Sequence, residues 1–337
     1  MGAQEAAAKV QSQYNPDERA GRLRPLPSIL TANDVTENGM YEDLVHFWHK
    51  QRHSLDALLH KDGAVLFRGF NVVGQVMFED MISSMGLKSL DYVDGNSPRK
   101  KLASGVYTST EYPAQYFISL HNELSYCAEW PARLFFCCER PAEQGGQTPL
   151  VDSRALLQAL PKEIVDEFRA KQVKYVRNLH GGRGVGPSWQ DTFETHDPEV
   201  VENYAGISGN IVEWQPDQSL RFWCTRPATA VHPTTGEEVW FNQAEQFHPS
   251  TLPKAVYESM TEIFAGHTEK LPQNAYFGDG TEIPLPYFQT IRSVTDNLRT
   301  SFDWQRGDLL MVDNMLVAHG RMPFKGERRI LVSMTGN

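Results

Sequence analysis

Apolar residues follow the period of a helix near the start of the chain and gather in a continuous run directly after it. Over residues 36–60, seven apolar side chains recur at helical spacing: Tyr41, Leu44, Val45, Trp48, Leu55, Leu58 and Leu59. Gly63 ends this predicted helix, residues 64–70 are typical of a buried strand, and residues 75–85 predict a second helix. This part of the chain is therefore predicted to fold as helix, strand and helix.

Later in the chain, short apolar runs bounded by Gly and Pro predict a protein made mainly of strands. These strands are expected over residues 115–120, 133–138, 172–176, 220–224, 238–241, 308–312 and 330–334. Two further helices are expected over residues 156–171 and 253–265. This order predicts a single α+β domain over residues 25–337, with a mainly β core built on an antiparallel double sheet. Residues 1–24 are expected to form a flexible tail.

Composition narrows the class of protein. The 337 residues are 40% hydrophobic and include 7 Trp, 12 Tyr and 17 Phe, which excludes a disordered or fibrous chain. No apolar run approaches the length of a membrane span. The net charge of −10 argues against nucleic-acid and anionic-membrane partners, but it leaves a small anionic ligand open. The glycine-rich residues 181–186 precede Pro187 rather than a helix, which argues against a phosphate-binding loop.

The cysteines and the N-terminus indicate a reducing compartment. The spacing of a zinc site or a disulfide framework does not occur among Cys127, Cys137, Cys138 and Cys224. We therefore expect these thiols to be reduced and mostly buried in strands. The first residues lack the layout of a signal peptide, and Ala6 stands where a myristoylation signal requires Ser or Thr. A cytoplasmic protein is predicted, and the sequence does not indicate its oligomeric state.

A candidate pair of metal ligands lies at the end of the strand predicted over residues 115–120. His121 and Glu123 are two positions apart, so in an extended strand both side chains point to one face and can bind one ion. Roughly 1.4 such His-x-acid pairs are expected by chance in this composition. The pairs that begin at His60 and His267 fall at or after predicted helix ends, where the geometry is unfavourable. The alternative is a surface histidine beside a solvated glutamate.

A third ligand is available from a distant strand. The predicted strand over residues 308–312 leads to Asp313 and Asn314, and His319 follows. Iron sites with two histidines and one carboxylate take a close pair of ligands and a third from another element. His319 can complete such a set with His121 and Glu123. The alternative is a hydrogen-bonded structural histidine at the end of a core strand.

Two further segments hold candidates for binding an anion. Arg328 and Arg329 precede the last predicted strand, and adjacent side chains in a strand face opposite ways, so one of them points inward. An inward guanidinium can bind a carboxylate through two parallel hydrogen bonds, whereas the alternative is a surface pair. Thr148 follows a turn that contains two glycines, and the alternative there is an ordinary turn.

These segments occur together, and in this order, in the taurine dioxygenase (TauD/TfdA) superfamily of iron(II)- and 2-oxoglutarate-dependent oxygenases, which the sequence resembles over nearly its whole length. The matching segments are residues 63–70, 119–125, 145–152, 225–228, 232–236, 239–243 and 307–330. Glu123 in place of the commoner Asp, together with residues 239–243, resembles the clavaminate synthase-like and SyrP-like branch. The resemblance implies a double-stranded β-helix, or jelly roll, with helical insertions.

The resemblance also implies a set of site residues. His121, Glu123 and His319 would ligate Fe(II), and the cosubstrate 2-oxoglutarate, used together with O₂, would chelate the metal. The far carboxylate of 2-oxoglutarate would pair with Arg329, with Thr148 as a second donor, while the preceding arginine faces outward. The implied enzyme is a dioxygenase that oxidises a C–H bond of a small molecule by hydroxylation, desaturation or cyclisation. Because related halogenases replace the carboxylate ligand by a small residue, Glu123 argues against halogenation.

The substrate is less closely defined. Taurine-type enzymes hold a sulfonate with an arginine one strand turn past the 2-oxoglutarate arginine, and Ser333 occupies that place here. By location, the candidates for substrate contacts are Trp240, Asn242, Arg183 and Tyr126, each with a structural role as the alternative. The branch resemblance implies an amino acid, free or tethered to a carrier protein, in natural-product biosynthesis. Two other classes stay open: a zinc-dependent hydrolase with the same ligands, and a catalytically silent module that binds a carrier protein.

Overall fold

The central element of the computed structural model is a seven-stranded sheet that packs on both faces. Its order is β1 (Ser28–Thr31), β2 (Ala64–Arg68), β15 (Leu309–Asp313), β6 (Arg133–Arg140), β18 (Arg329–Thr335), β4 (Val106–Thr108) and β3 (Lys101–Ala103). β1 and β2 are parallel, and the other neighbours are antiparallel. The structure describes residues 26–35, 39–90, 94–95, 101–103, 105–109 and 112–336, so the predicted tail over residues 1–24 lies outside the described residues.

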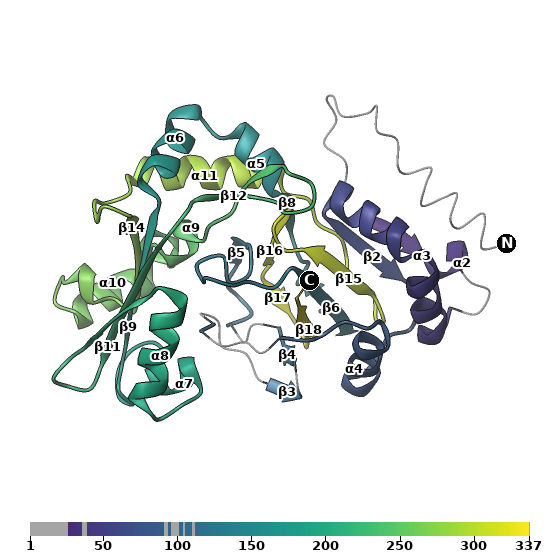
Figure 1. Cartoon of the computed structure of the whole chain (residues 1–337), viewed down its shortest axis with the longest axis horizontal. Coiled ribbons are helices and arrows are strands. Elements are labelled where there is room, and N and C mark those ends of the chain that lie inside the picture. The colour runs from purple at the N-terminus through teal and green to yellow at the C-terminus, as the bar shows by residue number, and fades with distance from the viewer. Residues whose placement is uncertain are drawn as a thin grey trace.

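Alternate side chains of this sheet enter two different cores. In β6, Leu134 and Phe136 face the central core, whereas Phe135 and Cys137 belong to a second core beneath α3 (Tyr41–Asp62) and α4 (Gln75–Ser84). Figure 1 shows these two helices lying against the outer side of the sheet. Because both faces are covered, the strands are apolar in both phases instead of alternating between apolar and polar residues.

A second sheet faces the inner side of the large one. It has the order β5 (Ile118–His121), β16 (Val317–Arg321) and β8 (Leu150–Asp152), all antiparallel. The ring of His319 in β16 lies 5.1 Å from the ring of Phe136 in β6, measured between centroids. The two sheets therefore enclose a common interior, and the predicted α+β fold with a strand-built core is confirmed.

The remaining elements form a lobe beside the two sheets and a layer of helices over them (Figure 1). A four-stranded antiparallel sheet in the lobe has the order β10 (Ile211–Trp214), β11 (Leu220–Arg226), β9 (Val173–Leu179) and β14 (Gln273–Phe277). Two short pairs are β12 (Thr229–Val231) with β13 (Glu238–Trp240), and β17 (Phe324–Lys325) with β7 (Gln144–Gly145). The other helices are α2 (Ala32–Val35), α5 (Ser153–Ala159), α6 (Lys162–Lys171), α7 (Trp189–Phe193), α8 (Pro198–Ser208), α9 (Ala244–Phe247), α10 (Lys254–Ile263) and α11 (Leu285–Leu298), with 3₁₀ turns η2 (Pro249–Thr251) and η3 (Thr268–Lys270).

The predicted strands are all present, with ends shifted by at most three residues. The single helix predicted over residues 156–171 is wrong, because the chain breaks it into α5 and α6. Pro161 stands between them and Leu160 takes an extended ψ of 142°, as the residue before a proline prefers. The prediction for the cysteines is confirmed, since all four are free and buried and three of them lie in β6 and β11.

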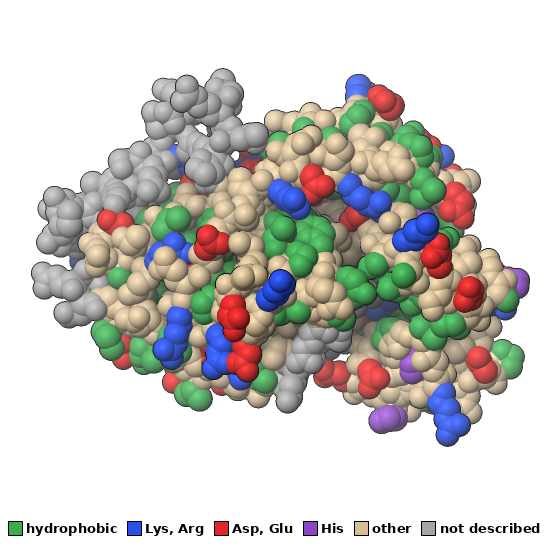
Figure 2. All heavy atoms as spheres, turned by 180° about the vertical axis from the view of Figure 1, so that it is seen from behind, with side chains coloured by type: hydrophobic (Ala, Val, Ile, Leu, Met, Phe, Trp, Pro, Cys, Tyr) green, Lys and Arg blue, Asp and Glu red, His purple; other side chains and the backbone are tan. Residues whose placement is uncertain are grey.

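Acidic and basic side chains are interspersed on the face of the molecule that Figure 2 shows. Neither the acidic nor the basic side chains form a large patch of one charge on this face. In the described part of the chain, no helix combines the length and the apolar content that crossing a bilayer requires.

Candidate metal centre

Two strands of the small sheet bring His121, Glu123 and His319 together. His121 ends β5 and pairs in register with His319 of β16, so the two imidazoles lie side by side with ring centroids 4.5 Å apart. Glu123 follows two residues later, and its Oε2 lies 3.9 Å from the Nε2 atoms of both histidines. The three side chains are 3–5% exposed, and their donor atoms lie within 4.8 Å of one another. They thus converge on one buried point.

The hydrogen bonding of His121 prepares it to bind a metal. Its Nδ1 lies 2.8 Å from the backbone carbonyl oxygen of Ser119. A carbonyl only accepts, so Nδ1 carries the proton and the lone pair is on Nε2, which lies 3.9 Å from Glu123 Oε2. This arrangement, in which the outer nitrogen of a ligand donates to a backbone carbonyl, is common in metal sites. Two imidazoles and one carboxylate form the donor set of a non-haem iron site, so the residues present fit such an ion.

The predicted orientation of the two arginines is wrong. Arg329 has a side chain that is 53% exposed and forms an ion pair with Glu139 on the surface. Arg328 is half-buried; its Nε donates to the Gly146 carbonyl at 2.9 Å and its Nη1 donates to Ser109 Oγ at 3.3 Å. The reason is the phase of β18, because Ile330 and the two alternate residues that follow it line the central core, and Arg328 shares their phase.

Burial, together with a smaller effect of the nearby cation of Arg321, lowers the pKa of Arg328 to about 10. Both guanidinium groups lie over the ring of Phe324, at 5.1 Å for Arg321 and 5.8 Å for Arg328. Among the described residues, no carboxylate is hydrogen-bonded to Arg328. The group is therefore a desolvated cation, in a place that favours an anionic ligand.

Thr148 is next to Arg321, one of these two arginines, in the small sheet. Backbone bonds from Gly320 to Pro149 and from Met322 to Gln147 continue the ladder between β16 and the residues before β8. Thr148 consequently lies opposite Arg321. It is buried, and its Oγ1 accepts a hydrogen bond of 3.1 Å from Trp304 Nε1.

The four predicted substrate residues are not brought together. Trp240 and Asn242 line a cavity of about 640 Å³ whose wall also contains Leu120 and Asn122, the residues of this segment that alternate with the metal ligands. That cavity therefore borders the face of β5 opposite to His121. Asn242 is also hydrogen-bonded to the backbone, since its Nδ2 donates to the Ala228 carbonyl at 2.8 Å.

Tyr126 and Arg183 lie elsewhere. Tyr126 is buried and donates its hydroxyl to the Asp94 carbonyl at 2.8 Å. Arg183 is exposed in the loop between β9 and α7. Substrate contacts by these residues stay a prediction.

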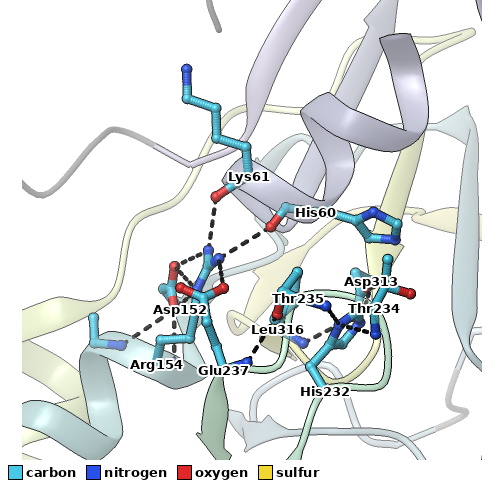
Figure 3. Close-up of polar contacts among 11 residues, drawn as sticks. His60, Lys61, Asp152, Arg154, His232, Thr234, Thr235, Glu237, Asp313 and Leu316 are labelled. Atoms are coloured by element: carbon cyan, nitrogen blue, oxygen red, sulfur yellow. Dashed lines mark hydrogen bonds and ion pairs between the residues drawn. The ribbon is translucent and has the colours of Figure 1, made fainter. Parts of the chain in front are cut away.

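A second cluster, His60 with His232 and Asp313, has the residue types of a metal site but the wrong protonation for one. Figure 3 shows the backbone N–H groups of Thr234 and Thr235 directed at the His232 ring, where both donate to Nδ1. His232 therefore carries its proton on Nε2 and donates it to Asp313 Oδ2 at 3.1 Å. The nitrogen that would face an ion is thus protonated, so the cluster is a structural hydrogen-bond network. Local sequence patterns do not indicate this network, because its members are far apart in the chain.

Comparison with known proteins defines the class of this protein. The model of the family described as "Taurine catabolism dioxygenase TauD, TfdA family" matches residues 24–335. The chain therefore belongs to the TauD, TfdA family of dioxygenases, and the predicted family and enzyme class are confirmed.

Two curated relatives are similar over most of their length. The chain is 39% identical over 282 residues to the dapdiamide synthesis protein DdaC of Enterobacter agglomerans, and 84% of each chain is covered. It is 33% identical over 295 residues to a clavaminate synthase-like protein of Arabidopsis thaliana, again with 84% of each chain covered. The second relative agrees with the branch that the motifs indicate.

Solved structures support the fold. The PvcB protein of Pseudomonas aeruginosa has a TM-score of 0.54 at 14% identity, with 96% of this chain and 94% of that chain covered. An asparagine oxygenase, solved with Fe(II), 3-hydroxyasparagine and succinate, has a TM-score of 0.53 at 14% identity, with 99% and 89% covered. The predicted jelly-roll architecture is thus shared with oxygenases of known structure.

Proposed function

We propose that this protein is an Fe(II)- and 2-oxoglutarate-dependent oxygenase that oxidises a C–H bond of a small molecule. The observation that carries the proposal is the convergence of His121, Glu123 and His319 on one buried point in a chain of this family. When bound there, Fe(II) and 2-oxoglutarate supply O₂-dependent oxidation of a C–H bond, in which 2-oxoglutarate is converted to succinate and CO₂.

The side chains of this protein orient the reactants and exclude water. His121 presents a neutral Nε2 because Ser119 fixes the proton on the other nitrogen. Phe136 packs against His319 from the large sheet and gives the interior an apolar wall. Such a wall keeps bulk water from the reacting atoms, so oxidation is directed to the bound substrate.

We assign the far carboxylate of 2-oxoglutarate to Arg328, with Thr148 as a second donor. The guanidinium of Arg328 is desolvated and bonded only to neutral groups among the described residues, whereas Arg329 forms a surface ion pair. A dicarboxylate would provide the anion that Arg328 lacks. A zinc hydrolase with the same three ligands would leave this cation without a counter-ion, so the site favours the oxygenase.

For the substrate, we propose an amino acid or an amino-acid derivative, free or tethered to a carrier protein. The names of similar proteins support this class: one is a dapdiamide synthesis protein, PvcB is an oxygenase from an isonitrile synthetic pathway, and a third protein of this fold is an asparagine oxygenase solved with 3-hydroxyasparagine. A cavity of about 800 Å³ borders Leu124, the residue after Glu123, and Met334 on the inner face of β18. We propose that the substrate reaches the metal from this cavity, whose size suits a small ligand.

The test is substrate-stimulated formation of succinate. Protein loaded with Fe(II) is mixed with 2-oxoglutarate, O₂ and a panel of amino acids, offered free and as thioesters on a carrier protein. We expect at least one member of the panel to raise succinate formation above the substrate-free rate, and His319→Ala to abolish the increase. If no member raises it, the proposed substrate class is wrong; if His319→Ala retains it, the proposed metal centre is wrong.

A further inference from the structure

The backbone of Glu123 is held by a side chain from a distant turn. β5 ends at His121, two residues before Glu123, and Leu124 after it has a left-handed φ of +56°. Asn314, in the turn between β15 and β16, contacts the backbone of Glu123 just beyond the end of β5. Its Oδ1 accepts from the Glu123 N–H at 2.7 Å, and its Nδ2 donates to the Glu123 carbonyl at 2.9 Å. The carboxamide thus bonds to both the N–H and the carbonyl group of Glu123.

Asn314 is itself fixed in place. It is fully buried, and its Nδ2 makes a second bond of 2.9 Å to the Pro131 carbonyl. Its own backbone N–H donates to the Ala132 carbonyl at 3.0 Å, and its carbonyl accepts from Asn122 Nδ2 at 2.7 Å. Only one orientation of the amide satisfies all its partners, because its oxygen must face an N–H group and its nitrogen two carbonyls.

The turn that carries Asn314 is also braced from its other side. Asp313 Oδ1 accepts from the N–H groups of Met315 and Leu316, both at 3.0 Å, and its Oδ2 accepts from His232 (Figure 3). The second histidine cluster therefore holds the turn in which Asn314, the residue after Asp313, contacts Glu123. A buried network in which every member is satisfied adopts one geometry.

We propose that Asn314 is a positioning residue that aims the Glu123 carboxylate at His121 and His319. The inference rests on the proposed function, because it takes Glu123 as a metal ligand. Glutamate has three side-chain torsions, so its carboxylate reaches a defined point only when the Cα–Cβ direction is fixed. Asn314 contacts the backbone of Glu123 and is not one of the three proposed ligands, so we expect it to act through Glu123. Partners of this kind affect metal affinity about 10–100-fold.

The test is a titration with Mn²⁺, followed by the electron paramagnetic resonance signal of the free ion, which requires no turnover. We expect Asn314→Ser to weaken Mn²⁺ binding about 10–100-fold. In a Glu123→Ala background, the same substitution should change the affinity less than about twofold, because the residue through which it acts is absent. Asn314→Asp, which keeps an acceptor for the Glu123 N–H but loses the donor, is measured in the same way and replaces Asn314→Ser if that variant does not fold.

The matched control is Asn274→Ser in β14. Asn274 is also a buried asparagine that bonds to backbone and side chain: its Oδ1 accepts from Ala275 N–H and its Nδ2 donates to the Tyr276 hydroxyl. This variant should lose stability but keep the wild-type affinity for Mn²⁺. The inference is overturned if the Asn314 variants bind Mn²⁺ like the wild type, or lose as much affinity when Glu123 is alanine. Wild-type protein that binds no Mn²⁺ would instead contradict the proposed function.

Discussion

At the scale of single residues, Arg328 and Arg329 form a natural pair for testing where 2-oxoglutarate binds. A charge-assisted pair contributes about 1.5–3 kcal/mol, so Arg328→Gln should raise the concentration of 2-oxoglutarate needed for half-saturation roughly 10- to 150-fold. Arg329→Gln removes a surface ion pair with Glu139 and should change it less than about twofold. Equilibrium titration of both variants with 2-oxoglutarate measures the difference. The reverse ranking would return the assignment to Arg329.

The choice between these two arginines could not be made from the sequence. Both faces of β18 carry apolar side chains, because one face meets the central core and the other meets α3 and α4. These side chains are Ile330, Leu331, Val332 and Met334. Alternation, the usual guide to orientation in a strand, is therefore lost. The metal ligands were predictable, because the spacing of His121 and Glu123 is local and the resemblance supplies His319. Asn314 was not, because its contact spans 191 residues and involves only the backbone of Glu123.

A buried histidine gives the protein a defined response to acid. Burial lowers the pKa of His248 from 6.5 to about 4, and the cation of Arg292 acts in the same direction. Between these values the unfolded chain binds the proton and the folded chain does not, so stability falls as the pH falls. From pH 7 to pH 5 this group should remove on the order of 2 kcal/mol from the free energy of unfolding.

Urea denaturation at the two pH values measures this loss. His248→Gln should unfold with a smaller difference between pH 7 and pH 5 than the wild type, since glutamine does not titrate. An equal difference in both proteins would show that other groups cause the acid response.

At the scale of elements, a buried ion pair joins the lobe to the residues near the metal ligands. Arg177 of β9 and Asp94 are paired, with side chains 4% and 2% exposed. Asp94 also accepts from Tyr204 of α8, and its carbonyl accepts from Tyr126. Arg177→Met leaves a buried carboxylate and should cost about 3–5 kcal/mol of unfolding free energy. The double variant with Asp94→Asn should recover part of that loss, which chemical denaturation can measure; a loss equal to the sum of both single variants would contradict the coupling.

The elements themselves were predicted unevenly, for physical reasons. Five strands of the two facing sheets (β2, β5, β6, β15 and β18) are short apolar runs between turns, and the sequence predicts them, whereas β1, β3, β4 and β16 are not among the predicted strands. The apolar period over residues 156–171 continues across Pro161 and therefore predicts one helix, although the proline separates α5 from α6. α8 and α11 were not predicted. α8 buries only Val201 and Ala205, so its apolar face is narrow. α11 buries Phe288 and Ile291 and packs Val294 and Leu298 against the central core, so its apolar period is present in the sequence.

At the scale of the whole molecule, the ligands at positions 121 and 319 connect distant parts of the chain, so metal binding should stabilise the fold as a unit. A ligand at 100 times its Kd adds about 2.7 kcal/mol. For a chain of this length that corresponds to a rise in Tm of roughly 4 °C, in one transition if residues 25–337 form one domain as predicted. Scanning calorimetry with Mn²⁺ and 2-oxoglutarate measures it, and Glu123→Ala should show a much smaller rise. An unchanged Tm at saturating ligand would contradict the connection.

The charge of the whole molecule differs in sign from the charge of the proposed cosubstrate site. The chain carries a net charge of −10, yet Arg321 and Arg328 lie together over Phe324 beside the small sheet. Two adjacent cations create a local positive potential that a dicarboxylate can meet at short range, while the surface charge discourages large polyanions. Net charge therefore bears on macromolecular partners, and local geometry bears on the small anion.

The most direct test of the central claim is the visible absorption of the protein with Fe(II) and 2-oxoglutarate under anaerobic conditions. Chelation of the metal by 2-oxoglutarate produces a metal-to-ligand charge-transfer band that needs neither substrate nor turnover. The account predicts this band in the wild-type protein, its absence in His121→Ala, and its appearance in Arg328→Gln only at much higher 2-oxoglutarate. A wild-type protein without the band, or a His121→Ala variant that keeps it, would contradict the account.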